Sequence, residues 1–184
     1  MAYACISFHF LKREYETLFI HRFSHATMPL TNLFKNCAHY WLLSGALIGR
    51  FLYSSEYQAP SVFWVLLNLL LFVAAEMANF YTHFVLSKLR PKGSTRRAVP
   101  NGFGFDWVSC PNYTFEILAW IAFSMMTGLW SGKPSLVVLS GVAWFFTAVA
   151  SAQMYFWAIK KHKRYRHEFP EYPHSRKILI PYLL

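Results

Sequence analysis

Apolar residues along the chain are gathered into four blocks, separated by polar and mostly basic segments. The second block, 61 to about 86, and the fourth, 135–159, each exceed the roughly 20 residues that a membrane-spanning helix needs. The third runs from about 114 to 130, and the first, 39–53, is short and contains Arg50. The pattern predicts an all-α protein, a polytopic membrane helix bundle with about four transmembrane helices.

Ahead of the first block, apolar and charged residues are mixed at helical intervals. Leu11, Tyr15 and Leu18 recur among Lys12 and Glu16. This spacing predicts an amphipathic helix that lies at the cytoplasmic interface or packs on the spans. The single domain of 184 residues then has three parts: a cytoplasmic or interfacial helix in 1–36, transmembrane spans in 37–159 and a cytoplasmic basic tail in 160–184.

Composition and charge support a membrane protein. Hydrophobic residues make up 55% of the chain and aromatic residues 20%, which is too apolar for a soluble domain of this size. The net charge is +10, but the basic residues flank the apolar blocks, so we expect membrane lipid and no nucleic acid as a partner. Basic segments precede the first block, separate the second from the third and follow the fourth. The positive-inside rule therefore places these segments and both termini in the cytoplasm.

Polar residues inside the second apolar block include three at helical spacing. Glu76, Asn79 and His83 are three and four residues apart and so share one helix face that points into the bundle. They form either an interhelical hydrogen-bond cluster or a ligand site. His83, His9 and His162 stand in no HxxxH or HxxE pattern, so no metal is expected.

The segment SCPNYTFE, at 109–116, stands where the third block begins. Pro111 fits just ahead of a helix start, Asn112 is a good N-cap, and Glu116 suits the first turns of a helix. Tyr113 is left to an interfacial aromatic belt or to a functional role. The nearby GFGF, at 102–105, lacks the third glycine and the βαβ context of a dinucleotide-binding fingerprint.

The last 25 residues, KKHKRYRHEFPEYPHSRKILIPYLL, combine a dense basic run with tyrosines and glutamates. The charges alone would serve as a positive-inside anchor. Arg164 or Arg166 could equally make bidentate contacts to a phosphate-bearing ligand. Composition does not separate these two interpretations.

Three segments in this order resemble a known family: FLKREYETLFIHRFSHATMPLTNLFKNC, VSCPNYTFEILAWIAF and QMYFWAIKKHKRYRHEFPEYPHSRKILIPYLL. They are similar to the very-long-chain trans-2-enoyl-CoA reductase branch of the steroid 5α-reductase family, and HRFSHATMP favours that branch over the steroid branch. The resemblance implies a multi-pass enzyme of the endoplasmic reticulum that catalyses the last step of fatty-acid elongation. NADPH would reduce a very-long-chain trans-2-enoyl-CoA to the saturated acyl-CoA, and other elongation enzymes are expected partners. The ubiquitin-like N-terminal region of these relatives has no counterpart in the chain.

The resemblance also implies roles for individual residues. Tyr113 matches the catalytic tyrosine, and Lys12 matches a lysine regarded as important for activity. Hydride attack on a conjugated thioester builds negative charge on the carbonyl oxygen, which a tyrosine hydroxyl can stabilise or neutralise. The positions that line or approach the cofactor site in related reductases are Asn112, Glu116, His162 and Tyr165, with Lys161, Arg164 and Arg166 as candidates for its phosphates.

Two alternatives remain open at the level of the sequence. A related reductase could act on a steroid or polyprenol double bond, which needs a cavity of different shape but similar cofactor residues. A catalytically silent short form could instead serve as a membrane scaffold in an elongation complex.

Overall fold

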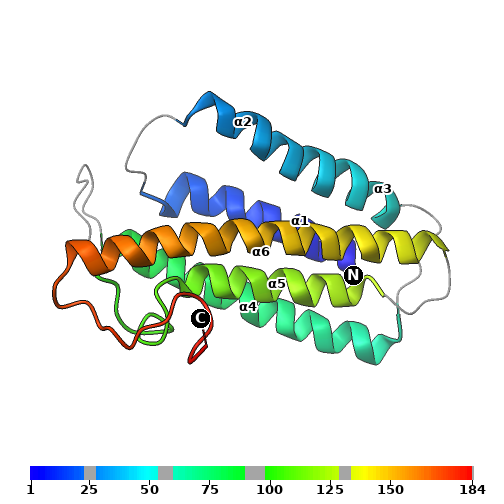
Figure 1. Cartoon of the computed structure of the whole chain (residues 1–184). Coiled ribbons are helices and arrows are strands. Elements are labelled where there is room, and N and C mark those ends of the chain that lie inside the picture. Colours follow the sequence, from blue (N-terminus) through cyan, green and yellow to red (C-terminus); the bar gives the residue numbers. More distant parts are fainter. Residues whose placement is uncertain (23–27, 54–59, 90–97, 129–133, 184) are drawn as a thin grey trace.

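The computed structural model describes residues 1–22, 28–53, 60–89, 98–128 and 134–183 (Figure 1). Its elements in chain order are α1 Ala2–Tyr15, η1 Glu16–Ile20, α2 Leu30–Cys37, η2 Ala38–Ile48, α3 Gly49–Leu52, α4 Val62–Lys88, α5 Pro111–Met126 and α6 Pro134–Glu168. Pairing of the strand type within the described residues is limited to one isolated bridge, between Val108 and Lys177. The predicted all-α helix bundle is confirmed.

Two of the described helices, α4 and α6, are long and apolar enough to cross a membrane. The 16-residue α5 lies between them and is about 24 Å long at 1.5 Å per residue. The first expected span is part of a longer helical stretch, α2–η2–α3, and α6 continues to Glu168. The expected boundaries at 36/37 and 159/160 therefore fall inside helices, because the polar and basic residues there are compatible with helix.

The two ends of the bundle differ in charge. The ends of η1, α4 and α6 and the start of α5 lie together, and we call this the basic end (Figure 1). At the opposite end Ser7 Oγ lies 2.9 Å from the hydroxyl of Tyr53, just beyond α3, and Trp64 at the start of α4 donates to the carbonyl of Met125 at the end of α5. The start of α1 therefore lies away from the basic end, although the charge pattern of the sequence places the N-terminus on the same side as the basic segments.

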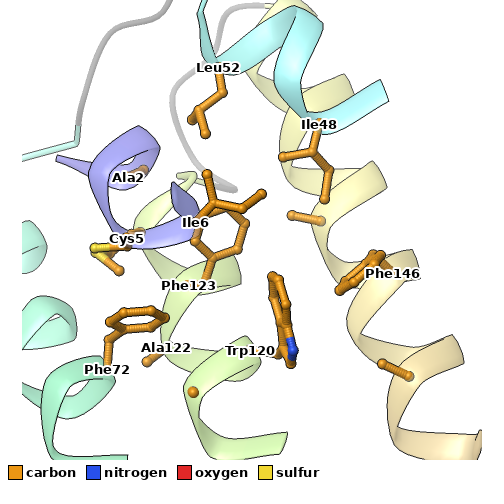
Figure 2. Close-up of a cluster of buried hydrophobic side chains, with 14 of the residues drawn as sticks. Ala2, Cys5, Ile6, Ile48, Leu52, Phe72, Trp120, Ala122, Phe123 and Phe146 are labelled. Carbon is orange, nitrogen blue, oxygen red and sulfur yellow. The ribbon is translucent and has the colours of Figure 1, made fainter. Parts of the chain in front are cut away.

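The core combines residues from every part of the bundle. Figure 2 shows Ile6 of α1, Phe72 of α4, Trp120 and Phe123 of α5 and Phe146 of α6 in one buried cluster. Because α1 contributes to this core, the packed alternative for the N-terminal helix is the correct one.

The orientation of α1 is the reverse of a water-facing amphipathic helix. Its apolar side chains at Phe8, Leu11 and Tyr15 are exposed, whereas His9 and Lys12 are buried against the other helices. A helix that buries charged side chains and exposes large apolar ones is suited to an apolar surrounding.

Candidate active site

The start of α5 carries the predicted tyrosine. Pro111 occupies the first helical position, where its missing N–H costs nothing, and Cys110 is the N-cap. The expected N-cap, Asn112, therefore lies one residue inside the helix, and Glu116 lies beyond its first turn. Proline fits within the first turn as well as before it, so the sequence placed the boundary one or two residues too late.

A glycine turn holds this helix start in place. Gly104 has a φ of 78°, and a Cβ there would lie only 2.8 Å from the Cβ of Pro111. The GFGF segment is therefore a tight turn that packs against α5. The adjacent Cys110 is buried, and burial raises the pKa of its thiol to about 11, so it stays protonated.

Helices α1 and α4 lie parallel and are joined by a ladder of polar contacts with matching three-then-four spacing. The facing pairs are His9 and Glu76, Lys12 and Asn79, and Glu16 and His83. As predicted, Glu76, Asn79 and His83 share one buried face. Their contacts correspond to the interhelical hydrogen-bond cluster, one of the two alternatives raised by the sequence.

Lys12 is the centre of this ladder. Its Nζ lies 2.7 Å from Glu76 Oε2, 2.5 Å from Asn79 Oδ1 and 3.5 Å from Glu16 Oε1. His9 Nδ1 lies 2.6 Å from the other Glu76 oxygen. Lys12 is only 9% exposed, so the attraction of its ammonium to the two carboxylates is weakly screened.

Asn79 links Lys12 to the helix that carries Tyr113. Its Nδ2 donates to the carbonyl of Asn112 at 2.8 Å and lies 3.4 Å from Glu116 Oε2. Lys12 therefore reaches the first turn of α5 through Asn79, a connection that the spacing of residues in the sequence does not reveal.

Glu16, His21 and His83 form a group that sequence reasoning missed, with possible ligand atoms within 4.8 Å of one another. Arg13 Nη1, however, lies 2.9 Å from Glu16 Oε2 and 3.3 Å from His83 Nδ1. Burial, with His83 and Arg13 adding to the effect, lowers the pKa of His21 to about 4. The carboxylate thus has a cationic partner already, and we assign no metal to this group.

Tyr113 is half-buried between α5 and α6. Its ring centroid lies 6.1 Å from that of Trp157. Lys161 Nζ lies 4.7 Å from the centroid of the Tyr113 ring. Among the predicted cofactor residues, Lys161 is the one whose described contacts include the tyrosine ring. An ammonium in this position favours negative charge on a bound group.

His162 and Tyr165 face the C-terminal segment, 169–183, which folds back over the start of α5. Ser109 Oγ lies 2.5 Å from His162 Nδ1 and 2.6 Å from the hydroxyl of the buried Tyr172. The rings of Tyr165 and Tyr172 stack with their centroids 5.6 Å apart. The segment expected to be a basic tail is therefore a packed part of the site, anchored by residues such as Tyr172 that carried no signal in the sequence.

Arg164 and Arg166 are exposed on α6. Arg164 Nε lies 3.9 Å from Glu168 Oε1, and Arg166 Nη2 lies 3.2 Å from His174 Nδ1. Such exposed contacts are weak, so both guanidinium groups remain available to an anion.

A cavity of about 560 Å³ lies next to Glu116 and Trp157. It is mostly apolar and is bounded by α2, η2, α5, α6 and His9 of α1. Its polar and aromatic lining residues include Lys35, His39, Glu116, Trp120, Phe146, Gln153 and Trp157. Of the predicted site residues, Glu116 lines the cavity directly, and Tyr113 adjoins it through Trp157.

The chain is similar to known proteins along its whole length. Residues 26–184 match the 3-oxo-5-alpha-steroid 4-dehydrogenase family. The chain is 47% identical over 188 residues to a putative enoyl reductase of Schizosaccharomyces pombe, covering 100% of the chain and 59% of that protein. It is 47% identical over 185 residues to a very-long-chain enoyl-CoA reductase of Dictyostelium discoideum and 40% identical over 192 residues to a probable one of Caenorhabditis elegans. These two alignments cover 100% of the chain and 58% of each relative, so the chain spans about three fifths of the length of these proteins.

Proposed function

The chain belongs to the 3-oxo-5-alpha-steroid 4-dehydrogenase family, and we propose that it reduces a very-long-chain trans-2-enoyl-CoA to the saturated acyl-CoA with NADPH. The observation that carries this proposal is the position of Tyr113. It stands at a rigid helix start, next to Trp157 at the wall of an apolar cavity. Proteins similar along the whole chain are named as enoyl reductases. An apolar cavity beside a proton donor suits an acyl chain with a reactive double bond near its head.

Tyr113 acts in the reduction as a hydrogen-bond donor or as an acid. Its hydroxyl either stabilises the negative charge that develops on the carbonyl oxygen of the thioester, or protonates the α-carbon next to that carbonyl. Lys161 lies next to the ring and favours that charge. Lys12 acts at a distance, because Asn79 connects it to the carbonyl of Asn112. We therefore describe Lys12 as a positioning residue.

The residues at the start of α5 suit a nicotinamide cofactor. The side-chain oxygen of Asn112 is buried and has no hydrogen-bond donor among the described residues, and a carboxamide N–H could satisfy it. His162 and Tyr165 hold the C-terminal segment against this region, while Lys161 and Arg166 supply positive charge for phosphates. NADPH, when bound, supplies the hydride.

The proposal is tested by NADPH consumption of the purified protein in lipid nanodiscs. Oxidation of NADPH with a long trans-2-enoyl-CoA, together with formation of the saturated product, is the expected result. Activity with only a steroid enone or a polyprenol would show that the protein reduces that class of substrate instead. Consumption with none of these substrates would favour the membrane scaffold.

Filling the cavity should inhibit the reaction. Ala150 is buried at the cavity wall, so Ala150→Phe would place a phenyl ring in the space of several methylene groups. We expect kcat/KM for a long enoyl-CoA to fall by about tenfold or more, because each lost methylene contact weakens binding. Steady-state kinetics measure the change.

Ala148→Phe is the matched control, because Ala148 is exposed on the same helix. It should leave kcat/KM within about twofold of the original protein, as surface substitutions usually have small effects. Equal losses in both variants, or no loss in Ala150→Phe, would show that the acyl chain does not occupy this cavity.

We further propose that the bundle lies in the endoplasmic-reticulum membrane with its basic end in the cytoplasm. Helices α1 and η1 together are about 28 Å long and lie parallel to α4, which supports a crossing by this helix too. The start of α1 would then face the lumen, unlike the C-terminal segment.

A glycosylation acceptor added before Met1 should be modified in microsomes, and one added after Leu184 should not. Modification of the C-terminal acceptor, or of neither, would contradict this orientation.

A further inference from the structure

One face of α6 leads from the cavity toward the basic end. Gln153, Trp157, Lys160 and Arg164 follow one another at intervals of four, three and four residues, so they share a stripe on the helix. Gln153 and Trp157 line the cavity, which fixes the direction of this face. Lys160 and Arg164 continue it outward and are exposed.

Helix α2 adds a third cation to the same place. Lys35 Nζ donates to Gln153 Oε1 at 3.3 Å and lies 5.7 Å from the ring centroid of Trp157. Lys35 also lines the cavity. This side of the cavity therefore carries positive charge from two helices; we take it as the cavity mouth and call Lys35, Lys160 and Arg164 the mouth cations.

The mouth cations are separate from the other basic residues of α6. Lys161 lies over the ring of Tyr113, and His162 bonds to Ser109 below the C-terminal segment. The end of α6 thus has two charged faces, one toward the start of α5 and one toward the cavity mouth. Two polyanions could lie on these faces without competing for the same cations.

We propose that the mouth cations bind the phosphates of the CoA head while the acyl chain occupies the cavity. The inference rests on the proposed function for its substrate class. A cavity with an apolar body and a cationic mouth suits an amphiphile whose anionic head stays outside. The stripe from Gln153 to Arg164 is about 16 Å long, so the head groups can spread along it. Arg164 therefore serves the acyl-CoA rather than the cofactor.

The test compares the binding of stearoyl-CoA with that of stearoyl-pantetheine, which has the same acyl chain and thioester but no phosphate. Calorimetry on the protein in zwitterionic-lipid nanodiscs needs neither NADPH nor turnover. Lys35→Met, Lys160→Met and Arg164→Met should each raise the Kd for stearoyl-CoA, by about tenfold for Lys35→Met, and leave the Kd for stearoyl-pantetheine unchanged. The affinity for stearoyl-CoA should also fall with added salt.

Lys163→Met is the matched control, because it removes one exposed charge from the same end of α6 but from outside the stripe. Its Kd for stearoyl-CoA should stay within about twofold of the original value. An equal loss in Lys163→Met would indicate nonspecific attraction, and an equal loss of both ligands in Lys35→Met would indicate an effect on the cavity. Either result, or no loss in any mouth-cation variant, overturns the inference.

Anionic lipid is the other source of phosphate at this surface. With a fifth of the lipid anionic, stearoyl-CoA should still bind with the same dependence on Lys35, and loss of that dependence would assign the mouth cations to lipid. The outcomes also separate this inference from the proposed function. Binding that depends on Lys35 without any reduction of enoyl-CoA would refute only the proposed function. Reduction unaffected by Lys35→Met would refute only the inference.

Discussion

Replacing Tyr113 with phenylalanine should lower the turnover of a long trans-2-enoyl-CoA by about two orders of magnitude or more. The change removes the hydroxyl and keeps the ring, so the packing against Trp157 is retained. Loss of a general acid or of an oxyanion donor usually has an effect of about this size. NADPH oxidation under saturating substrate measures kcat, and calorimetry should show an unchanged Kd for NADPH.

Tyr182→Phe is the control for this experiment, because Tyr182 is 85% exposed. It makes the same chemical change in the C-terminal segment and should leave kcat within about twofold of the original value. Near-normal turnover in Tyr113→Phe would show that the hydroxyl of Tyr113 takes no part in the reaction.

Replacing Lys12 with methionine should destabilise the bundle by about 3 kcal/mol or more. Methionine has nearly the length of lysine but no charge, so Glu76 would keep a buried carboxylate without the ammonium that lies 2.7 Å from it. Breaking a buried ion pair on one side is costly for this reason. Denaturation in detergent, followed by circular dichroism, measures the change. Turnover should fall as well, because the link through Asn79 to α5 is lost.

A double-mutant cycle with Glu76→Gln tests the ion pair itself. The double variant should be more stable than the sum of the two single effects predicts, because neither charge is left alone. Additive effects would show that the two side chains do not interact. A Lys12→Met variant with full stability and lost turnover would assign Lys12 a direct part in the chemistry, in place of a positioning role.

The helical interior of the protein could be predicted in outline. The apolar blocks around α4 and α6 are long enough that no other structure would satisfy their backbone in a membrane. The shared face of Glu76, Asn79 and His83 followed from helical spacing alone. The start of α5 was located to within one or two residues, because proline allows either the first helical position or the one before it.

The partners of these residues could not be predicted. Helical spacing shows that three side chains point the same way, but not that α1 lies parallel to α4 and meets them with Lys12. The hydropathy of α1 is low because its charges are counted as if they faced water, whereas they neutralise one another inside the bundle. The packing of the C-terminal segment was equally hidden, since its basic composition gave no sign that its Tyr172 would be buried.

The sequence by itself determined the class of fold, the periodic faces of its helices and the resemblance to a reductase family, because these depend on local spacing and on short motifs. The tertiary structure decided which residues meet: Lys12 with Glu76 and Asn79, Lys161 with Tyr113, and Lys35 with Gln153 and Trp157. These pairs are far apart along the chain. Only the packing of helices sets their distances, and an electrostatic contact depends on distance and burial rather than on sequence separation.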